Sequence, residues 1–157
     1  MNRVAKVSLV FSVFFLSLLV YVGVQNVLIY DALYKVNIEI EKVIADELTE
    51  TKAILSVTMN IFNPGLVDVR ITRFLWEIYL NDELIGSNDA HPNKLIPPSK
   101  AYIVTKQFEV KHTQTLHTLL QAHEQNKWVW RIVGSARFDT PLFKMEIPFD
   151  KELISSD

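Results

Sequence analysis

The side chains that could perform chemistry are few in this sequence, and their spacing does not assemble them into a reactive motif. The chain has four histidines and no cysteine, so it offers no thiolate for a metal site, a disulfide or a lipoprotein anchor. His117 and His123 are six residues apart. This spacing places them off a common helical face, whereas a metal-binding pair on a helix is typically four residues apart. We therefore expect solvated histidines and no metal site.

Nucleophile and phosphate-binding motifs are missing as well. Gly86-Ser87 and Gly134-Ser135 lack the second glycine of a G-x-S-x-G nucleophile elbow. Four glycines in the whole chain leave no glycine-rich loop that could surround a phosphate. The acidic pairs Asp46-Glu47 and Asp82-Glu83 fall in expected turns, where solvation explains adjacent carboxylates better than general acid–base catalysis does. The sequence therefore predicts a protein that is not an enzyme and needs no cofactor.

A long apolar segment opens the chain. Residues 7–29 are predominantly apolar, and a helix of this length would measure about 34 Å, enough to cross a hydrocarbon core about 30 Å thick. Arg3 and Lys6 precede the segment, and no acidic residue occurs before Asp31. This bias keeps the N-terminus in the cytoplasm and exports the remainder. The sequence thus predicts an uncleaved, single-pass membrane anchor.

The chain is accordingly expected to have two parts. Residues 1–30 form the cytoplasmic N-terminus and the anchor, and residues 31–157 form an extracytoplasmic domain. The alternative for the first part is a cleaved secretory signal, but its apolar region would exceed the usual ~7–15 residues, and no Ala-x-Ala-like cleavage site follows. Without Arg3 and Lys6 the chain retains 14 basic and 18 acidic residues. A mildly acidic domain without a basic stripe disfavours nucleic acid as a partner.

Alternating apolar and polar residues predict strands around a central turn. Apolar side chains occupy every second position in residues 53–61 and again in residues 67–71, as in strands with one buried and one wet face. Between these strands, Pro64 removes a donor from the ladder and Gly65 is expected to be free to adopt a positive φ. The apolar set then moves from odd to even positions across Thr72-Arg73, which predicts a β-bulge.

Further elements complete an antiparallel β-sandwich with one added helix, which is the predicted fold class. The strand that begins at residue 67 is expected to continue through this bulge to residue 80, and additional strands are expected at residues 35–43, 84–86, 95–96, 101–110, 128–138 and 142–149. Turns are expected at residues 46–51, 81–83 and 139–141, and a long loop at residues 87–100. In residues 113–126 the spacing of Leu116, Leu119 and Leu120 is helical.

Several short motifs carry a family resemblance. Asn63-Pro64-Gly65 after an alternating strand resembles the N-P-N motif of the LEA2 family, the water-stress and hypersensitive-response (WHy) domain. Three further family-like positions follow in order, namely Gly86 after a short turn, Pro97 within Ile96-Pro97-Pro98-Ser99, and Gly134 in a late strand. The resemblance covers residues 36–149. Gly65 stands where the family often has Asn, a change that we expect to be conservative because both residue types tolerate positive φ.

The resemblance implies a fibronectin-III-like or immunoglobulin-like sandwich in which these motif residues are structural. It also implies a non-enzymatic role in protection during desiccation or other water stress, and membrane-anchored members are familiar in this family. On this basis we expect a membrane-anchored protein that shields client proteins or the membrane surface by binding.

The aromatic residues leave a second function open. Ordinary core packing explains them, but an apolar cleft between the sheets, open under the helix, would accept an acyl chain. Its expected lining is Trp76, Leu116, Leu119, Leu120, Trp128 and Trp130. Lipid binding or transfer at the membrane surface is therefore the alternative function, and adhesion or assembly through exposed strand edges is a third.

Overall fold

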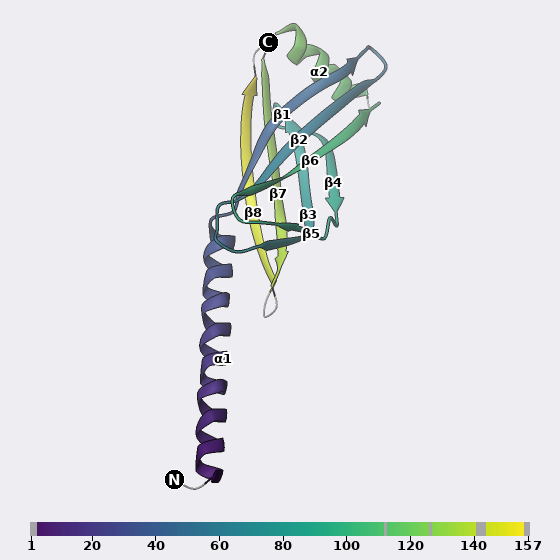
Figure 1. Ribbon diagram of the computed structural model, residues 1–157. Helices are drawn as coiled ribbons and strands as arrows, with labels where there is room; N and C mark the ends of the chain where they lie inside the picture. Colours follow the sequence, from purple (N-terminus) through teal and green to yellow (C-terminus); the bar gives the residue numbers. More distant parts are fainter. Residues whose placement is uncertain (1–2, 112, 126, 141–143, 156–157) are drawn as a thin grey trace.

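A computed structural model describes residues 3–111, 113–125, 127–140 and 144–155 of the chain. It shows a long N-terminal helix followed by an antiparallel β-sandwich with one short helix (Figure 1). In chain order the elements are α1 (Arg3–Tyr34), β1 (Asn37–Leu48), β2 (Ala53–Asn63), β3 (Val69–Leu80), β4 (Glu83–Ala90), β5 (Lys94–Ile96), β6 (Lys100–Val110), α2 (Thr113–Glu124), β7 (Trp128–Asp139) and β8 (Lys144–Ser155). The predicted all-β sandwich with an added helix is confirmed.

The strands form two sheets, which we call sheet A and sheet B. Sheet A has three strands in the order β1-β2-β6, and sheet B has five, in the order β4-β3-β7-β8 with β5 paired to β3. All described pairings are antiparallel. Each strand of a sandwich alternates inward and outward side chains, and β2 does so clearly, with its odd-numbered residues buried from Ala53 to Asn63.

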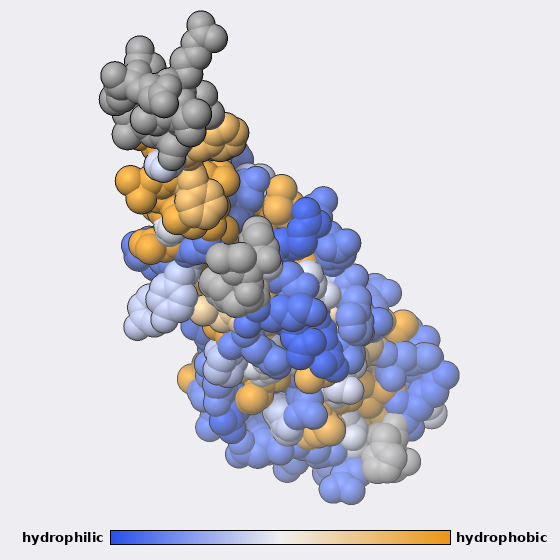
Figure 2. Space-filling model, turned by 90° about the horizontal axis from the view of Figure 1, so that it is seen from below, coloured by the Kyte–Doolittle hydropathy of each residue, from blue (hydrophilic) through white to orange (hydrophobic). Residues whose placement is uncertain are grey.

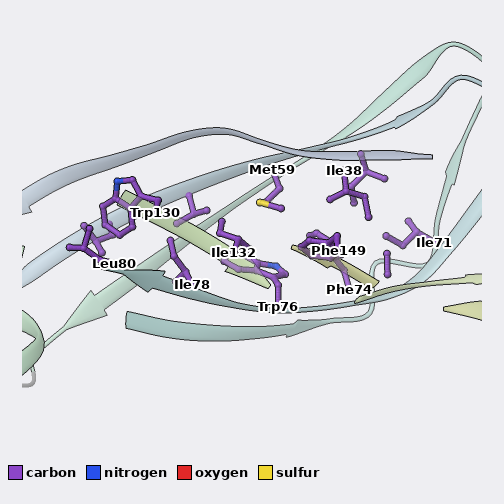
Figure 3. Packing of buried hydrophobic residues seen from close by; sticks show 14 of the residues in the cluster. Ile38, Met59, Ile71, Phe74, Trp76, Ile78, Leu80, Trp130, Ile132 and Phe149 are labelled. Atoms are coloured by element: carbon purple, nitrogen blue, oxygen red, sulfur yellow. The ribbon is translucent and has the colours of Figure 1, made fainter. Parts of the chain in front are cut away.

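Aromatic side chains join the two sheets in the core. Met59 of sheet A faces Trp76 and Phe149 of sheet B (Figure 3). Trp76 meets Phe108 of sheet A edge to face, with ring centroids 5.3 Å apart, and Phe74 stacks on Phe149 at 5.5 Å. Burying a large apolar side chain contributes about 1.5–3 kcal/mol. Because the chain has no cysteine, this core holds the domain together without disulfides.

The predicted bulge in β3 and the predicted hairpin after it are confirmed. The register of β3 on β7 shifts between Ile71 and Arg73, where the apolar pattern changed parity. Asn81 and Asp82 form the turn to β4 with φ angles of 48° and 66°. These are the left-handed values that a two-residue hairpin loop with the native twist requires.

The prediction for the first strand was wrong at both ends. α1 continues to Tyr34, so β1 begins at Asn37, and β1 then runs through the expected turn as far as Leu48. Two register shifts interrupt β1, between Ile40 and Lys42 and between Ala45 and Glu47. Each bulge changes which face the next residue occupies. The second half of the strand therefore shows no continuous alternation in the sequence.

Two other strands are longer than predicted. β4 continues to Ala90 through part of the expected loop, because Ser87, Asn88 and Asp89 pair with β3 although their side chains have low β-propensity. β8 continues to Ser155 and pairs with β7 along its whole length. The expected start of this strand, at residues 142–143, and the last residue of the expected turn, at 141, lie outside the described residues.

Helix α1 leaves the sandwich at one end, and α2 covers the opposite end (Figure 1). Within α1, residues Phe11–Tyr34 are long and apolar enough to cross a membrane, a test that a signal sequence would also pass. Ala32 and Leu33 in the last turn are buried against the sandwich. Only Lys35 and Val36 separate α1 from β1, so the helix joins the domain without a flexible linker.

Candidate functional site

The end of the sandwich that receives α1 is organised by Asn63. Its buried side chain donates hydrogen bonds from Nδ2 to the carbonyl oxygens of Val67 and Ile96, both at 2.9 Å, and accepts one at Oδ1 from the backbone N–H of Gly65 at 3.0 Å. The backbone N–H of Ser99 donates to the carbonyl of Asn63 at 2.8 Å. One residue therefore ties three segments together. We call residues 63–67 the Asn63 corner.

Gly65 has a different role from the one expected. No glycine in the described residues has a positive φ, so Gly65 does not adopt the left-handed conformation that the sequence allowed. A Cβ atom at this position would lie 2.3 Å from Cβ and 2.7 Å from Cα of Ala32. Glycine is needed here because the last turn of α1 packs directly on the Asn63 corner. An asparagine in its place would collide with α1, so the exchange is not conservative in this chain.

The other motif glycines also make room for packing. A Cβ atom on Gly86 would lie 2.6 Å from the ring of Phe108 on the facing sheet. Gly134 pairs with Trp76 on one side and with Phe149 on the other, and a Cβ atom there would come within 2.7 Å and 2.8 Å of their side chains. These positions therefore support the aromatic core and present no reactive group.

The two motif prolines lie at the surface of the same end. Pro64 is exposed within the Asn63 corner, and Pro97 is exposed at the turn between β5 and β6. The carbonyl of Pro97 accepts a hydrogen bond from the N–H of Lys100 at 3.2 Å, and Ser99 within this turn has a φ of 56°. The turn places the backbone N–H of Ser99 where it donates to the carbonyl of Asn63.

A cleft of about 480 Å³ lies at the other end of the sandwich. We call it the distal cleft; its lining residues are Val43, Ile44, Ala45, Leu48, Leu120, His123, Trp128 and Trp130. The rings of Trp128 and Trp130 stack with centroids 5.7 Å apart and planes 12° from parallel, and His123 lies 6.2 Å from Trp128. The cleft thus has an aromatic wall from β7, with β1 and α2 forming its other sides.

The structure divides the residues predicted to line an apolar cleft. Leu120, Trp128 and Trp130 line the distal cleft, whereas the other three are buried in the core. Those three are Trp76, Leu116 and Leu119. Sequence reasoning missed the contribution of β1 beyond Val43, because the predicted strand ended there and residues 46–51 were expected to form a turn. The sequence placed His123 on the same predicted helix as Leu120, and this helical spacing was the signal that His123 could lie beside the cleft.

No metal-binding cluster appears among the described residues, where no group of three or more His, Asp or Glu side chains is placed to hold an ion. The carboxylates considered for catalysis have structural contacts instead. Asp46 accepts a hydrogen bond from Ser56, and Glu83 accepts one from Thr118, which links β4 to α2. His112 lies outside the described residues.

The outer faces of the two sheets differ in character. Sheet B carries three arginine–carboxylate pairs, Arg73–Asp89, Arg131–Asp150 and Arg137–Glu146, with N–O distances of 2.7, 2.6 and 3.2 Å. Hydrogen bonds from the arginines lower the pKa of the Asp89 and Asp150 carboxyls, and those from Ser135 and then Arg137 lower the pKa of Glu146. Sheet A exposes the large apolar side chains of Ile44, Phe62 and Ile103, and sheet B exposes Leu84, Leu95 and Ile154 in addition to its ion pairs.

Comparisons with known proteins define the class of fold. No protein-family model and no curated protein sequence matches the chain. The solution structure of an Arabidopsis thaliana protein matches with a TM-score of 0.60 at 10% identity, covering 76% of this chain and 80% of that one. A solution structure described as a candidate late embryogenesis abundant (LEA) protein matches with a TM-score of 0.54 at 11% identity, covering 87% and 84%.

The same fold also occurs in a protein with a different description. A crystal structure of a candidate ApaA protein from Bordetella pertussis matches with a TM-score of 0.52 at 10% identity, covering 78% of this chain and 93% of that one. At such low identities these likenesses show the fold alone. The chain therefore has a sandwich of the kind found in LEA-type proteins, and its function has to be argued from its own surfaces.

Proposed function

We propose that this protein is a membrane-anchored LEA2-type protein that protects nearby proteins or the membrane surface during water stress, by binding and without catalysis. The observation that carries the proposal is the match of the sandwich to the candidate LEA protein over 87% of the chain. The order of the motif residues Asn63, Gly86, Pro97 and Gly134 supports the same assignment, because each of them has a structural role in this sandwich.

Helix α1 supports the membrane part of the proposal. It is long and apolar enough to span a bilayer, and Arg3 and Lys6 at its start favour a cytoplasmic N-terminus. The domain would then stand on the extracytoplasmic side. Because Ala32 and Leu33 are buried in the sandwich, the anchor and the domain form a continuous unit.

The two outer faces suggest how such a domain would bind. A client that loses water exposes apolar segments, and exposed apolar side chains on a folded protein mark a surface that can cover them. Ile44 and Ile103 provide such side chains on sheet A. The ion-paired outer face of sheet B is strongly hydrated and would keep the complex soluble.

The proposal is tested with dye-loaded vesicles that carry the full chain and are dried together with a labile reporter enzyme. The recovered enzyme activity reports protection of proteins, and the retained dye reports protection of the membrane. Vesicles carrying only residues 1–36, with albumin added to equal mass, are the control. Recovery of either quantity above this control supports the proposal, and equality in both would refute it.

The distal cleft favours a second candidate function, the binding of a lipid or another small apolar ligand. A volume of about 480 Å³ is within the range of ligand sites, about 300–1,000 Å³. The lining residues of β1 begin at Val43, six residues and about 20 Å beyond the start of the strand at Asn37. A membrane lipid would therefore have to leave the bilayer to reach the cleft.

This second function is tested by native mass spectrometry of the protein extracted from membranes, compared with a Leu120→Trp variant that fills the cleft. A bound lipid on the unmodified protein that the variant lacks would support it. Lipid-free spectra of both proteins, or equal lipid on both, would exclude the cleft as the site.

A further inference from the structure

We propose that the end of the sandwich from which α1 emerges is a second membrane-contact surface, in which Leu66 enters the lipid headgroup layer beside α1. We call this surface the base and define it as residues 63–68 and 92–100. The inference rests on the proposed anchoring of α1 in a bilayer and goes beyond it. It specifies the height and orientation of the domain above the membrane.

The Asn63 corner lies close to the end of the apolar segment of α1. The apolar segment that would fill the hydrocarbon core ends at Ile29, and Gly65 packs on Ala32. Three helical residues advance the chain by about 4.5 Å. The headgroup layer on one side of a bilayer is about 5–7 Å thick, from a total of about 40–45 Å around a core of about 30 Å. The corner therefore lies at the depth of the headgroups.

The junction between α1 and β1 holds the domain at this height. Ala32 and Leu33 are buried in the sandwich, and two residues, Lys35 and Val36, join α1 to β1. The backbone N–H groups of both residues donate hydrogen bonds to carbonyls in the last turn of α1. A flexible linker would let the sandwich float above the bilayer, whereas this short and bonded junction holds the base against it.

The base and the adjoining end of α1 expose apolar and aromatic side chains. Leu66 follows Gly65 directly and is 78% exposed, and Leu95 on β5 is also exposed. Tyr30 and Tyr34 on α1 are exposed at the same end, and tyrosine is enriched where membranes meet water. Exposure of these apolar side chains to water is unfavourable, and insertion into the membrane–water interface would remove them partly from water.

Charged side chains of both signs lie near these apolar side chains, namely Lys94, Lys100 and the exposed Asp68. Lys100 pairs in register with Asn63, which places it at the level of the corner, and Lys94 lies on β5. Neither lysine forms an ion pair within the described part of the chain. Seen from below, the underside of the sandwich is mainly hydrophilic around the apolar α1, with isolated apolar side chains (Figure 2). This mixture suits phosphate headgroups better than a hydrocarbon interior.

The absence of native cysteine permits a direct test with single labels on the full chain. A polarity-sensitive fluorophore is attached to Leu66→Cys in nanodiscs of phosphatidylcholine and phosphatidylglycerol, and its quenching by spin-labelled lipid is measured. Leu84→Cys is the matched control, because Leu84 is 48% exposed and lies on β4 next to the Asn81-Asp82 turn, near α2. Tyr21→Cys within α1 is the reference for a label inside the bilayer.

We expect strong quenching at position 21, intermediate quenching at position 66 and quenching at the solvent level at position 84. Solvent-level quenching at position 66 with strong quenching at position 21 would overturn the base as a membrane contact while α1 remained in the bilayer. Solvent-level quenching at position 21 would overturn the anchoring and this inference together. Since Leu66 is largely exposed, labelling it leaves the sandwich packing intact.

Discussion

Replacing Asn63 with alanine should destabilise the domain more than its position at the very end of β2 suggests. The substitution removes two donors and one acceptor that join the carbonyls of Val67 and Ile96 to the N–H of Gly65. A hydrogen bond contributes about 1 kcal/mol net, and buried partners left unsatisfied add to the loss. We therefore expect a decrease of about 3 kcal/mol in the free energy of unfolding. This is a large share of the 5–15 kcal/mol typical of a domain.

The same strand provides a matched control. The Oδ1 atom of Asn60 is buried but has no hydrogen-bond partner among the described residues. Asn60→Ala should therefore change stability by less than about 1 kcal/mol. Asn63→Asp keeps the shape of the side chain but turns a second oxygen toward two carbonyls, so it should destabilise at least as strongly as Asn63→Ala.

The assay is thermal unfolding of the full chain in nanodiscs, followed by the near-ultraviolet circular dichroism of the buried tryptophans. A loss of about 3 kcal/mol corresponds to a decrease in Tm of about 10 °C for a domain of this size. Equal midpoints for Asn63→Ala and Asn60→Ala would refute the reasoning that the Asn63 side chain holds the corner together.

Three further predictions follow from the same structure. Gly65→Ala should push the last turn of α1 off the Asn63 corner and lower the free energy of unfolding by about 1–3 kcal/mol, which would be measured as faster hydrogen exchange at residues 31–36. Gly23→Ala is the control and should have no effect, because a Cβ atom at Gly23 would have no neighbour within 4 Å. The free energy of unfolding should fall as the pH drops below about 4, because the pKa values of three carboxyls are lower in the folded than in the unfolded state. Their stabilisation is complete above the unfolded pKa values and is lost as the pH falls through the folded ones. Denaturant midpoints that stay constant from pH 6 to pH 3 would contradict this, and Arg131→Gln, which removes the partner of Asp150, should reduce the decrease. Ile103→Lys on the 56% exposed outer position of sheet A should lower the recovery of a dried client enzyme, while Leu84→Lys should not; equal recovery would exclude that face as the binding surface.

The sequence was sufficient to predict the strands and the helix that show a regular alternation over their own length. β2, β6, α2 and β7 follow uninterrupted periods of two or 3.6 residues, and their positions agree with the prediction. The bulge between Ile71 and Arg73 was also predictable, because one clean alternation simply changed parity. In β1 two bulges follow each other within a few residues, so no stretch between them is long enough to show a regular alternation of apolar and polar residues.

The sites could not be predicted completely because they depend on contacts between residues that are far apart in the sequence. Three residues that line the distal cleft, Ile44, Ala45 and Leu48, lie in the part of β1 beyond the predicted strand. The role of Gly65 depends on contact with Ala32, a residue from another element, and no local pattern reports such a contact. The motif therefore predicted that position 65 requires a glycine-like residue. The physical reason is the close contact between Gly65 and Ala32, and not a positive φ.

The most direct test of the proposed function is the activity of the reporter enzyme after drying with vesicles that carry the full chain. We predict higher recovery than with vesicles that carry residues 1–36 and an equal mass of albumin, and this advantage should persist when the protein is less abundant than the enzyme. Recovery no better than this control, together with equal dye loss from both kinds of vesicle, would contradict a protective function for this membrane-anchored sandwich.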